Sequence, residues 1–282
     1  MNFLKLSLGL IAVTALFVLS TTQFTACTKT KTAIIHDTTT VTKHDTTTVT
    51  KVDTLVVVDS VIDLKDGLVA YYNFDNGSLN DGSGYGNNIT FNNATPTTDR
   101  FGNANSAYLF DGTTSYMQVP NSASLNPSNL TLMAIFKVNG FYTGPCHGNN
   151  LMSKGYPDGI NGWYVLRFGN FGPDCNSPVD TSHELFLGGI TGVGGAADTP
   201  MVKTGQWYNL IFTYDGIVSN LYLNGQLKKS WAGTASFATN SHDLFIGKHE
   251  DPSFPYYFNG VIDEIRIYNE ALPLNVIKKL SD

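Results

Sequence analysis

The sequence predicts an all-β fold in which two antiparallel sheets pack as a sandwich. From Gly67 onward, apolar and polar residues alternate in short segments that are separated by clusters of Gly, Asn, Asp and Pro. Helical periodicity is confined to residues 273–280, which begin with Pro273 and predict a short C-terminal helix. The chain also has 27 Gly, 14 Tyr and 17 Phe against 14% charged residues, which is typical of an exported β protein.

Several segments carry the strand pattern, enough for two sheets. They are residues 68–75, 107–119, 130–138, 162–168, 184–190, 206–214, 219–223, 244–247 and 258–268. The strongest turn signal is Asn224-Gly225, because this pair suits the tight turn between two antiparallel strands. We therefore expect a hairpin at this position.

Residues 1–26 have the pattern of a lipoprotein signal peptide. An uncharged run from Leu6 to Leu19 follows Lys5, and it is too short and wrongly flanked for a membrane-spanning helix. The string Phe24-Thr25-Ala26-Cys27 resembles the bacterial lipobox, in which the Cys becomes the lipidated first residue. The resemblance implies an exported protein held in the cell envelope through lipidated Cys27, with the outer membrane favoured and the leaflet open. Cleavage that leaves Cys27 free is the alternative.

Residues 27–66 are rich in Thr, and we interpret them as an extended tether. The octapeptide HDTTTVTK occurs at residues 36–43 and again at 44–51, and the related VDTLVVVD follows at 52–59. An even period keeps each repeat position on one side of an extended chain, but little apolar area is available before Leu55. The alternative is that this run pairs as strands with a copy on another molecule.

Two further cysteines, Cys146 and Cys175, lie in the body of the chain. Export would place them in an oxidising compartment, so we expect a disulfide between them. Two free thiols are the alternative.

Residues 67–282 contain several motifs of one domain family. GLVAYYNFDNGSLNDGSGYGNN, RFGNANSAYLFDGTTSYMQVP, QWYNLIFTYDG with LYLNGQL, and FNGVIDEIRIYNEAL occur in this order. They resemble the successive signatures of LamG-like jelly-roll domains, which belong to the concanavalin A-like lectin and glucanase superfamily. The resemblance implies a jelly-roll sandwich over residues 67–282.

The predicted strand at 258–268 contains a carboxylate where apolar residues are expected. Strict alternation places Asp263 on the face of Ile265 and Ile267, and Glu264 on the opposite face. A buried carboxylate is costly unless it is paired, capped or bound to a cation. The family resemblance implies a structural Ca²⁺ site. Its candidate ligands are Asp263, Asp75, Asp111 and Asp81. Capping of backbone N–H groups, or an ion pair between Asp263 and Arg100, is the alternative.

Catalysis is not favoured by the sequence. Glucanases of this superfamily carry Glu-x-Asp-x-x-Glu on one strand, and the chain contains no such string. A retaining glycosidase needs two carboxylates about 5 Å apart, whereas alternation directs Asp263 and Glu264 to opposite faces, and Glu184 stands alone. The motifs G-x-S-x-G and H-E-x-x-H are also missing. We predict a noncatalytic protein, with a glycoside hydrolase as a less favoured alternative.

Ligand contacts are expected around residues 162–169, where Tyr164, Leu166 and Phe168 form the core face. Trp163 and Arg167 share the other face, and this pair suits stacking on a sugar ring and hydrogen bonding to its hydroxyls. The candidate binding residues, which include two from the neighbouring loop, are Trp163, Arg167, His147 and Tyr142. We predict carbohydrate binding, with contact to a surface protein as the alternative. A net charge of -6 without a basic cluster argues against nucleic acid.

Overall fold

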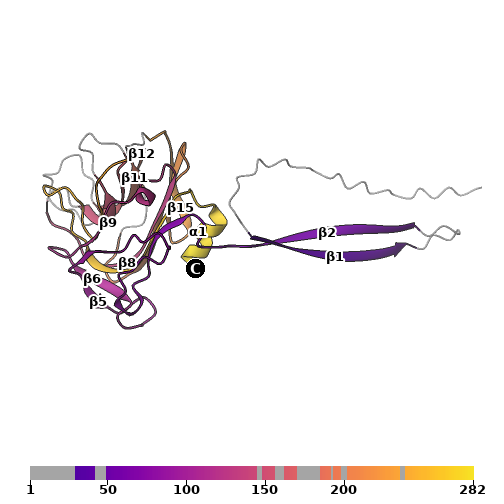
Figure 1. The fold of residues 1–282 in the computed structure, drawn as a ribbon, viewed down its shortest axis with the longest axis horizontal. Coiled ribbons are helices and arrows are strands. Elements are labelled where there is room, and N and C mark those ends of the chain that lie inside the picture. The colour runs from indigo at the N-terminus through magenta and orange to yellow at the C-terminus, as the bar shows by residue number, and fades with distance from the viewer. Residues whose placement is uncertain are drawn as a thin grey trace, which may run out of the picture.

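The predicted two-sheet sandwich is confirmed by the computed structural model, which describes residues 29–41, 49–144, 148–155, 162–169, 185–191, 193–197, 202–235 and 239–282. Both sheets are antiparallel, and a short helix, α1 (Leu274–Ser281), follows the last strand (Figure 1). Among these residues, no helix has the length and apolar character needed to cross a membrane.

The first sheet has seven strands in the order β12-β11-β10-β9-β16-β7-β4. Their bounds are β4 (Phe91–Asn92), β7 (Met117–Val119), β9 (Gly148–Lys154), β10 (Tyr164–Gly169), β11 (Leu185–Ile190), β12 (Val193–Ala197) and β16 (Leu244–Ile246).

The second sheet has eight strands in the order β15-β14-β13-β8-β17-β6-β5, and β3 pairs with β17 beside β6. Their bounds are β3 (Leu68–Tyr72), β5 (Thr95–Thr97), β6 (Ala107–Asp111), β8 (Leu130–Gly140), β13 (Trp207–Tyr214), β14 (Val218–Leu223), β15 (Gln226–Ala232) and β17 (Asn259–Tyr268). Two 3₁₀ turns, η1 (Asp75–Gly77) and η2 (Ala123–Leu125), lie in the connections.

The main core lies between the two sheets. As predicted, Tyr164, Leu166 and Phe168 of β10 belong to it, and the Phe168 ring stacks on Phe136 of β8 with 5.7 Å between centroids. Aromatic side chains each bury a large apolar area, so this layer contributes much of the hydrophobic stabilisation.

A second apolar cluster covers the outer face of the eight-stranded sheet. Val276, Ile277 and Leu280 of α1 pack there with Met133 and Tyr268, and Asn209 donates to the Leu280 carbonyl at 2.8 Å. The eight-stranded sheet is therefore packed on both faces. The outer face of the seven-stranded sheet carries the polar groups that form the candidate site.

The predicted hairpin at Asn224-Gly225 is confirmed. Strands β14 and β15 meet at the pair Leu223 and Gln226, and φ is 49° at Asn224 and 74° at Gly225. Two successive positive φ angles define the turn that joins twisted antiparallel strands, and Asn and Gly tolerate them best.

The predicted strand at residues 107–119 is wrong as one element. It divides into β6 and β7, which belong to different sheets, because the Asp111 carboxylate accepts hydrogen bonds from the backbone N–H groups of Thr113, Thr114 and Ser115, at 2.8 to 2.9 Å, and fixes a turn. Strand β9 is not among the predicted strands, because its sequence, GNNLMSK, has no clear alternation of apolar and polar residues.

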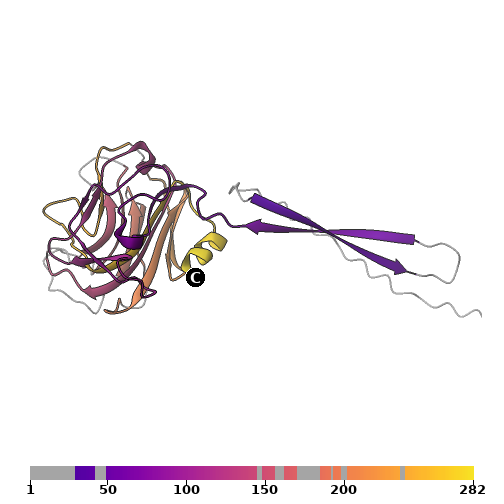
Figure 2. The ribbon, with the colours of Figure 1, turned by 60° about the horizontal axis from the view of Figure 1, so that its bottom comes forward.

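The segment expected to be an extended tether folds back on itself. Strand β1 (Lys29–Val41) pairs antiparallel with β2 (Val49–Val61), from Lys29 opposite Val61 to Val41 opposite Val49. Figures 1 and 2 show this hairpin projecting from the sandwich. A chain that turns back in this way spans less distance than the single extended chain expected from the sequence.

Candidate functional site

The candidate site lies on the outer face of the seven-stranded sheet, where β9 runs beside β10. Arg167 of β10 stands opposite Asn150 of β9, and the register between these strands shifts between Leu166 and Arg167. The shift is a β-bulge at Leu151, which stays in the main core. Asn150 is thereby placed on the outer face with Arg167, although it is one residue from a core position.

The ring of Tyr256 covers this pair. The Arg167 guanidinium carbon lies 5.1 Å from the centroid of the ring, and the Asn150 backbone N–H donates to the Tyr256 carbonyl at 2.9 Å. The φ angle of Tyr256 is 45°, a conformation that bulky residues rarely adopt. A Cβ at Gly148 would come within 2.8 Å of the same ring, so only Gly permits this close approach to β9.

The rings beside Tyr256 include those of Tyr142 and His249. Tyr142 meets it edge to face with 6.2 Å between centroids, and the His249 ring lies 5.5 Å away. The Tyr142 backbone N–H donates to the Asn149 Oδ1 at 2.7 Å, which fixes the loop before β9. The arrangement combines one guanidinium with three ring side chains and a buried amide.

Electrostatics leave Arg167 as the cation of this group. Burial, and then the positive charge of Arg167, lower the pKa of His249 to about 4, so its imidazole is neutral at pH 7. Burial also lowers the pKa of Arg167 and raises that of Tyr256. An Arg stays charged in proteins despite such a shift, and Tyr256 keeps its hydroxyl proton.

The side chain of Asn150 is fully buried. Its Nδ2 donates to the Lys248 carbonyl at 2.6 Å and to the Ser153 Oγ at 3.2 Å, and its Oδ1 has no hydrogen-bond partner among the described residues. An unsatisfied buried acceptor costs about 1 to 3 kcal/mol. A ligand that brings a hydroxyl donor to this Oδ1 would recover part of that free energy.

Aromatic residues continue across the same face toward β4. Register pairs place Ser153, Phe245, Gln118 and Phe91 in one row on neighbouring strands. Phe91, which is 41% exposed, stacks on Tyr116 with 4.6 Å between centroids. The row ends in a large apolar ring at the surface of an edge strand.

The Lys248 ammonium contacts two rings of this aromatic row. It lies 4.3 Å from the Tyr116 ring centroid and 4.9 Å from that of Phe245, and burial lowers its pKa. Because the carbonyl of the same residue accepts the Asn150 amide, Lys248 links the aromatic row to the group around Arg167.

Of the predicted binding residues, Arg167 and Tyr142 converge on Tyr256, and Trp163 does not. Trp163 and Arg167 share a face of one strand but are four positions apart, about 13 Å at the usual rise. The Trp163 ring lies against Gly189 of β11, where an added Cβ would be 3.8 Å from Cζ3. His147 lies outside the described residues, as do Cys27, Cys146 and Cys175.

The predicted calcium ligands are held by internal donors. Asp81 accepts the backbone N–H groups of Tyr71, Ser83 and Asn87 at 2.9 to 3.0 Å. Burial raises the pKa of the Asp111 carboxyl, but the Thr114 hydroxyl and the backbone N–H groups of the turn outweigh it and hold this pKa well below the usual range. Asp75 accepts from the nearby Asn73 side chain at 2.5 Å.

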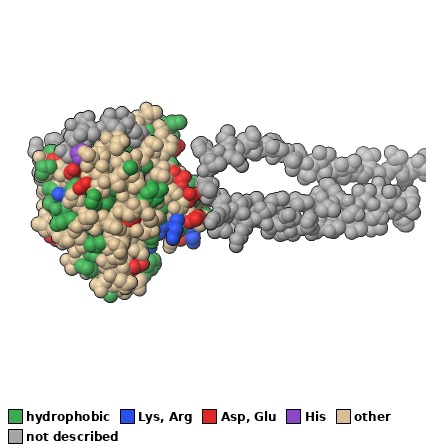
Figure 3. Space-filling model, in the orientation of Figure 1, with side chains coloured by type: hydrophobic (Ala, Val, Ile, Leu, Met, Phe, Trp, Pro, Cys, Tyr) green, Lys and Arg blue, Asp and Glu red, His purple; other side chains and the backbone are tan. Residues whose placement is uncertain are grey.

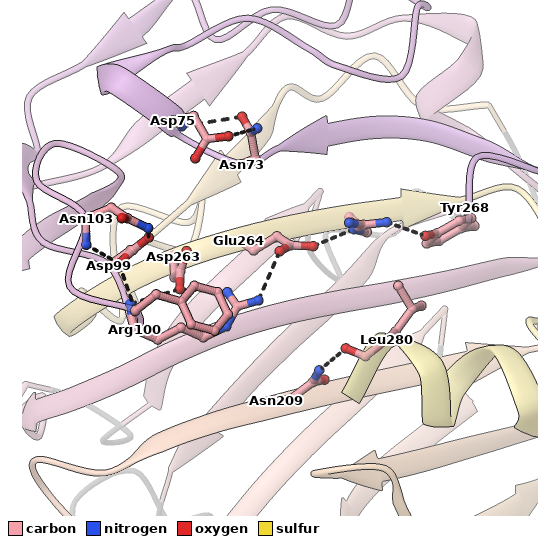
Figure 4. A network of polar contacts seen from close by, with 12 residues as sticks. Asn73, Asp75, Asp99, Arg100, Asn103, Asn209, Asp263, Glu264, Tyr268 and Leu280 are labelled. Carbon is pink, nitrogen blue, oxygen red and sulfur yellow. Dashed lines mark hydrogen bonds and ion pairs between the residues drawn. The ribbon is translucent and has the colours of Figure 1, made fainter. Parts of the chain in front are cut away.

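Asp263 takes the alternative that the sequence left open, an ion pair with Arg100. Its Oδ2 accepts from the Arg100 Nη1 at 2.7 Å and from the Arg100 backbone N–H at 3.2 Å (Figure 4). Burial raises the pKa of Asp263, and the hydrogen bonds from Arg100 oppose that rise. Within the described ranges, no three His, Cys, Asp or Glu side chains come together to hold a metal ion. In this arrangement each of the four predicted ligands is held by a donor of the protein itself, and calcium binding stays a prediction.

The expected alternation around Asp263 is wrong because β17 contains a bulge there. Its register with β8 shifts between Ile262 and Glu264, so Ile262, Ile265 and Ile267 all face the main core. The bulge lies where the partner of β17 changes from β6 to β3, and Arg100 fills the gap.

Asp263 and Glu264 consequently do not point to opposite faces. Arg100 contacts both, with its Nη2 3.6 Å from the Glu264 Oε2, and Glu264 also pairs with the Arg266 Nε at 2.5 Å (Figure 4). Arg266 continues the network to the Tyr268 hydroxyl at 3.3 Å. These carboxylates are neutralised by cations that hold the sheet together.

Comparisons with known proteins give one family. The profile of the Concanavalin A-like lectin/glucanases superfamily matches residues 111–278. No curated protein matches the chain.

Many solved structures have a similar fold. Domain 4 of AbnA, a GH43 extracellular arabinanase from Geobacillus stearothermophilus solved with arabinotriose, is 22% identical, with a TM-score of 0.53 over 76% of this chain and 98% of that domain. The binding domain of Paraclostridial Mosquitocidal Protein 1 is 14% identical, with a TM-score of 0.55 over 78% of this chain and 52% of the other. The receptor binding domain of botulinum neurotoxin D is 13% identical, with a TM-score of 0.56 over 78% and 53%. At these identities the likeness shows the fold.

Proposed function

The chain belongs to the concanavalin A-like lectin/glucanases superfamily, and from this premise we propose that residues 67–282 are a noncatalytic module that binds carbohydrate. The observation that carries the proposal is the meeting of Arg167, Asn150 and Tyr256 on the outer face of the seven-stranded sheet. A guanidinium donates to sugar oxygens, a buried amide oxygen accepts a hydroxyl, and the aromatic rings pack on the C–H face of a pyranose or furanose.

The surface chemistry is compatible with an uncharged polar ligand. On the face shown in Figure 3, most of the described surface carries no charge. The arabinanase domain with arabinotriose has the same fold, which makes arabino-oligosaccharides a first set of probes.

One feature supports a noncatalytic role. Asp263 and Glu264 are adjacent carboxylates, but both are engaged by Arg100. A general acid must be able to release its proton to substrate, and a carboxylate nucleophile must be open to attack. Neither condition is met by groups that are paired with buried or half-buried arginines.

The test is a glycan array, followed by calorimetric titration of the full-length chain in detergent with each glycan that binds. Replacing Arg167 by Met removes the charge but keeps most of the apolar stem, and we expect affinity to fall about tenfold, the effect of one charge-assisted hydrogen bond. Lys229→Met is the matched control, because Lys229 is exposed and also lies over a ring, 5.9 Å from the Trp231 centroid. Equal losses in both variants, or the absence of any bound glycan, would contradict the proposal and favour contact with a surface protein.

We also propose that the module is exported and anchored in the cell envelope through lipidated Cys27. The support is the lipobox-like string that ends at Cys27 and the uncharged run before it. Cys27→Ser should move the chain from the detergent phase to the aqueous phase in a Triton X-114 partition. Unchanged partition of that variant would reject the anchor.

A further inference from the structure

Lys154 is a buried lysine whose hydrogen-bond acceptors are amides. It is the last residue of β9 and has no exposed surface. Its Nζ donates to the Asn126 Oδ1 at 2.8 Å and also contacts the Oδ1 of Asn240. A buried ammonium is costly unless an opposite charge lies against it, and among the described residues no carboxylate forms an ion pair with Lys154. This setting favours the neutral amine.

The neutral amine is the nucleophilic form of a lysine. Burial lowers the pKa of Lys154 from 10.5 to about 8, although the negative charges of Glu250 and Asp243 act in the opposite direction. With such a pKa, about a tenth of the molecules hold an uncharged amine at pH 7. Lysines that act as nucleophiles are desolvated in the same way. The next question is which group this nitrogen can reach.

The side-chain amide of Asn240 is held where Lys154 can attack it. Asn240 is buried, and its Oδ1 accepts the backbone N–H of His242 at 3.2 Å in addition to the contact with Lys154. Donors at a carbonyl oxygen stabilise the negative charge that develops there when a nucleophile adds to the carbon. The Nδ2 donates to the Gly162 carbonyl at 2.9 Å, which fixes the amide in orientation. Since Cγ is bonded to the oxygen that Lys154 contacts, nucleophile and target carbon are neighbours.

We propose that Lys154 and Asn240 are a modification site, at which an intramolecular isopeptide bond joins the end of β9 to the segment before β16. The neutral Nζ adds to Cγ, so that an N–C bond forms and the bond between Cγ and Nδ2 breaks. One proton passes from Nζ to Nδ2 and ammonia leaves, which balances atoms and charge without a further reactant. A general base carries such a proton directly or through one water, and Glu250 is the carboxylate with the largest effect on Lys154. This inference does not depend on the proposed carbohydrate binding.

Asn240 is a better target than Asn126, the other amide that Lys154 contacts. Asn126 is partly exposed, and its Nδ2 donates to the Ser122 carbonyl at 2.8 Å within its own loop. Burial excludes water from the amide of Asn240, which strengthens the effect of the donors around it. A bond to Asn240 also links neighbouring strands, since Lys154 stands opposite Leu244 of β16. It closes a loop of about 85 residues in the unfolded chain, and such a closure stabilises the folded state.

The test measures the mass of the denatured and reduced full-length chain and of its tryptic peptides. The bond lowers the mass by one ammonia, about 17 Da. It also blocks cleavage after Lys154, so that trypsin yields one branched peptide from residues 138–167 and 230–248. Asn240 can also lose ammonia by cyclising onto its own backbone. Lys154→Met separates the two reactions, because only the isopeptide bond needs the lysine.

We expect the wild type to show both the mass loss and the branched peptide, and Lys154→Met and Asn240→Ala to show neither. Asn240→Asp should restore the branched peptide with loss of water in place of ammonia, and Asn126→Ala is the matched control that should behave as wild type. An unmodified wild-type mass, with cleavage after Lys154, would overturn the inference. A mass loss that persists in Lys154→Met, or one that persists in Asn240→Ala and disappears in Asn126→Ala, would overturn it as well.

Discussion

Each of two β-bulges in this molecule places polar side chains beside an arginine, and the two groups of residues that result differ in charge. The bulge at Asp263 in β17 places Asp263 and Glu264 against Arg100. The bulge at Leu151 in β9 places Asn150 opposite Arg167. In the first case two carboxylates meet the cation. In the second the facing group is a neutral amide whose oxygen has no hydrogen-bond partner in the part of the chain that the structure describes.

The contrast separates a structural polar network from a binding surface. Around Asp263, every charge has a counter-charge nearby, and the network closes a gap in the sheet between β6 and β3. Around Arg167, the Tyr256 ring lies against the guanidinium, and Asn150 on β9 has a side-chain oxygen with no hydrogen-bond partner among the described residues. A closed network contributes stability, whereas an incomplete one can gain hydrogen bonds from a ligand.

The largest effect is expected from a substitution that breaks the ion-pair network at the bulge around Asp263. Arg100→Met leaves the buried Asp263 without its cation, and we expect a loss of about 3 kcal/mol in the free energy of unfolding at pH 7. Urea denaturation measures this loss. Arg167→Met is the control, and it should cost less than about 1 kcal/mol because no buried carboxylate among the described residues depends on it.

Lowering the pH should reduce the loss of unfolding free energy caused by Arg100→Met. Burial raises the pKa of Asp263, so the folded state holds this proton more firmly than the unfolded state does. Protonation of Asp263 therefore stabilises the folded state below the ordinary Asp pKa. This stabilisation is lost as pH rises through the pKa of Asp263 in the folded state. If the loss of unfolding free energy in Arg100→Met is no smaller at pH 4 than at pH 7, the ion pair between Arg100 and Asp263 does not have the role assigned to it.

The second bulge should show the opposite dependence on pH, through His249. Its pKa is lowered from 6.5 to about 4, so the unfolded state binds more protons than the folded state between these values. Stability should rise by up to about 3 kcal/mol from pH 4 to pH 6.5 and then level off. In urea denaturation, His249→Gln should remove this rise in the free energy of unfolding with pH. The same rise with pH in wild type and variant would refute the role of His249.

These bulges also mark the limit of what the sequence predicts. Alternation correctly assigned the core residues of β10 and the position of β17. It failed at Asp263 because a bulge changes the facing of all residues on one side of it, and alternation within one strand does not show where a bulge will form. Strand β9 was missed for a related reason. Its Asn149 and Asn150 are fully buried. Asn149 accepts the Tyr142 N–H of the loop before β9, and Asn150 donates to the carbonyl of Lys248, which is distant in sequence.

The candidate site was predicted in part for the same reasons. Arg167 and Tyr142 were found because they lie on or beside a clear strand pattern. Tyr256 and His249 lie in an irregular loop that follows β9 by about a hundred residues in the sequence. No local sequence pattern indicates where such a loop packs. A signal was present in Gly148, since a Gly next to a strand can mark a close approach of another group.

A smaller effect is expected where Tyr256 meets β9. Gly148→Ala places a Cβ 2.8 Å from the Tyr256 ring, so the ring must move, and we expect a loss of about 1 to 2 kcal/mol together with weaker glycan binding. Gly189→Ala is the matched control on the same sheet, where the nearest atom to the added Cβ is the Val193 carbonyl oxygen at 3.4 Å. Thermal melting and calorimetric titration measure both variants. Equal behaviour of the two would show that the position of Tyr256 does not depend on Gly148.

The smallest effect is expected from calcium. The carboxylates of Asp81 and Asp111 accept backbone N–H groups, and that of Asp263 accepts Arg100, so a cation would have to replace donors that are already in place. Such an exchange yields little net free energy, because each donor lost offsets part of the new coordination. Thermal melting in excess calcium and in excess chelator should therefore differ by less than about 2 °C, which corresponds to less than about 1 kcal/mol. A larger rise with calcium would show that these aspartates rearrange around the ion, and Asp111→Asn and Asp263→Asn would then identify which bulge or turn supplies its ligands.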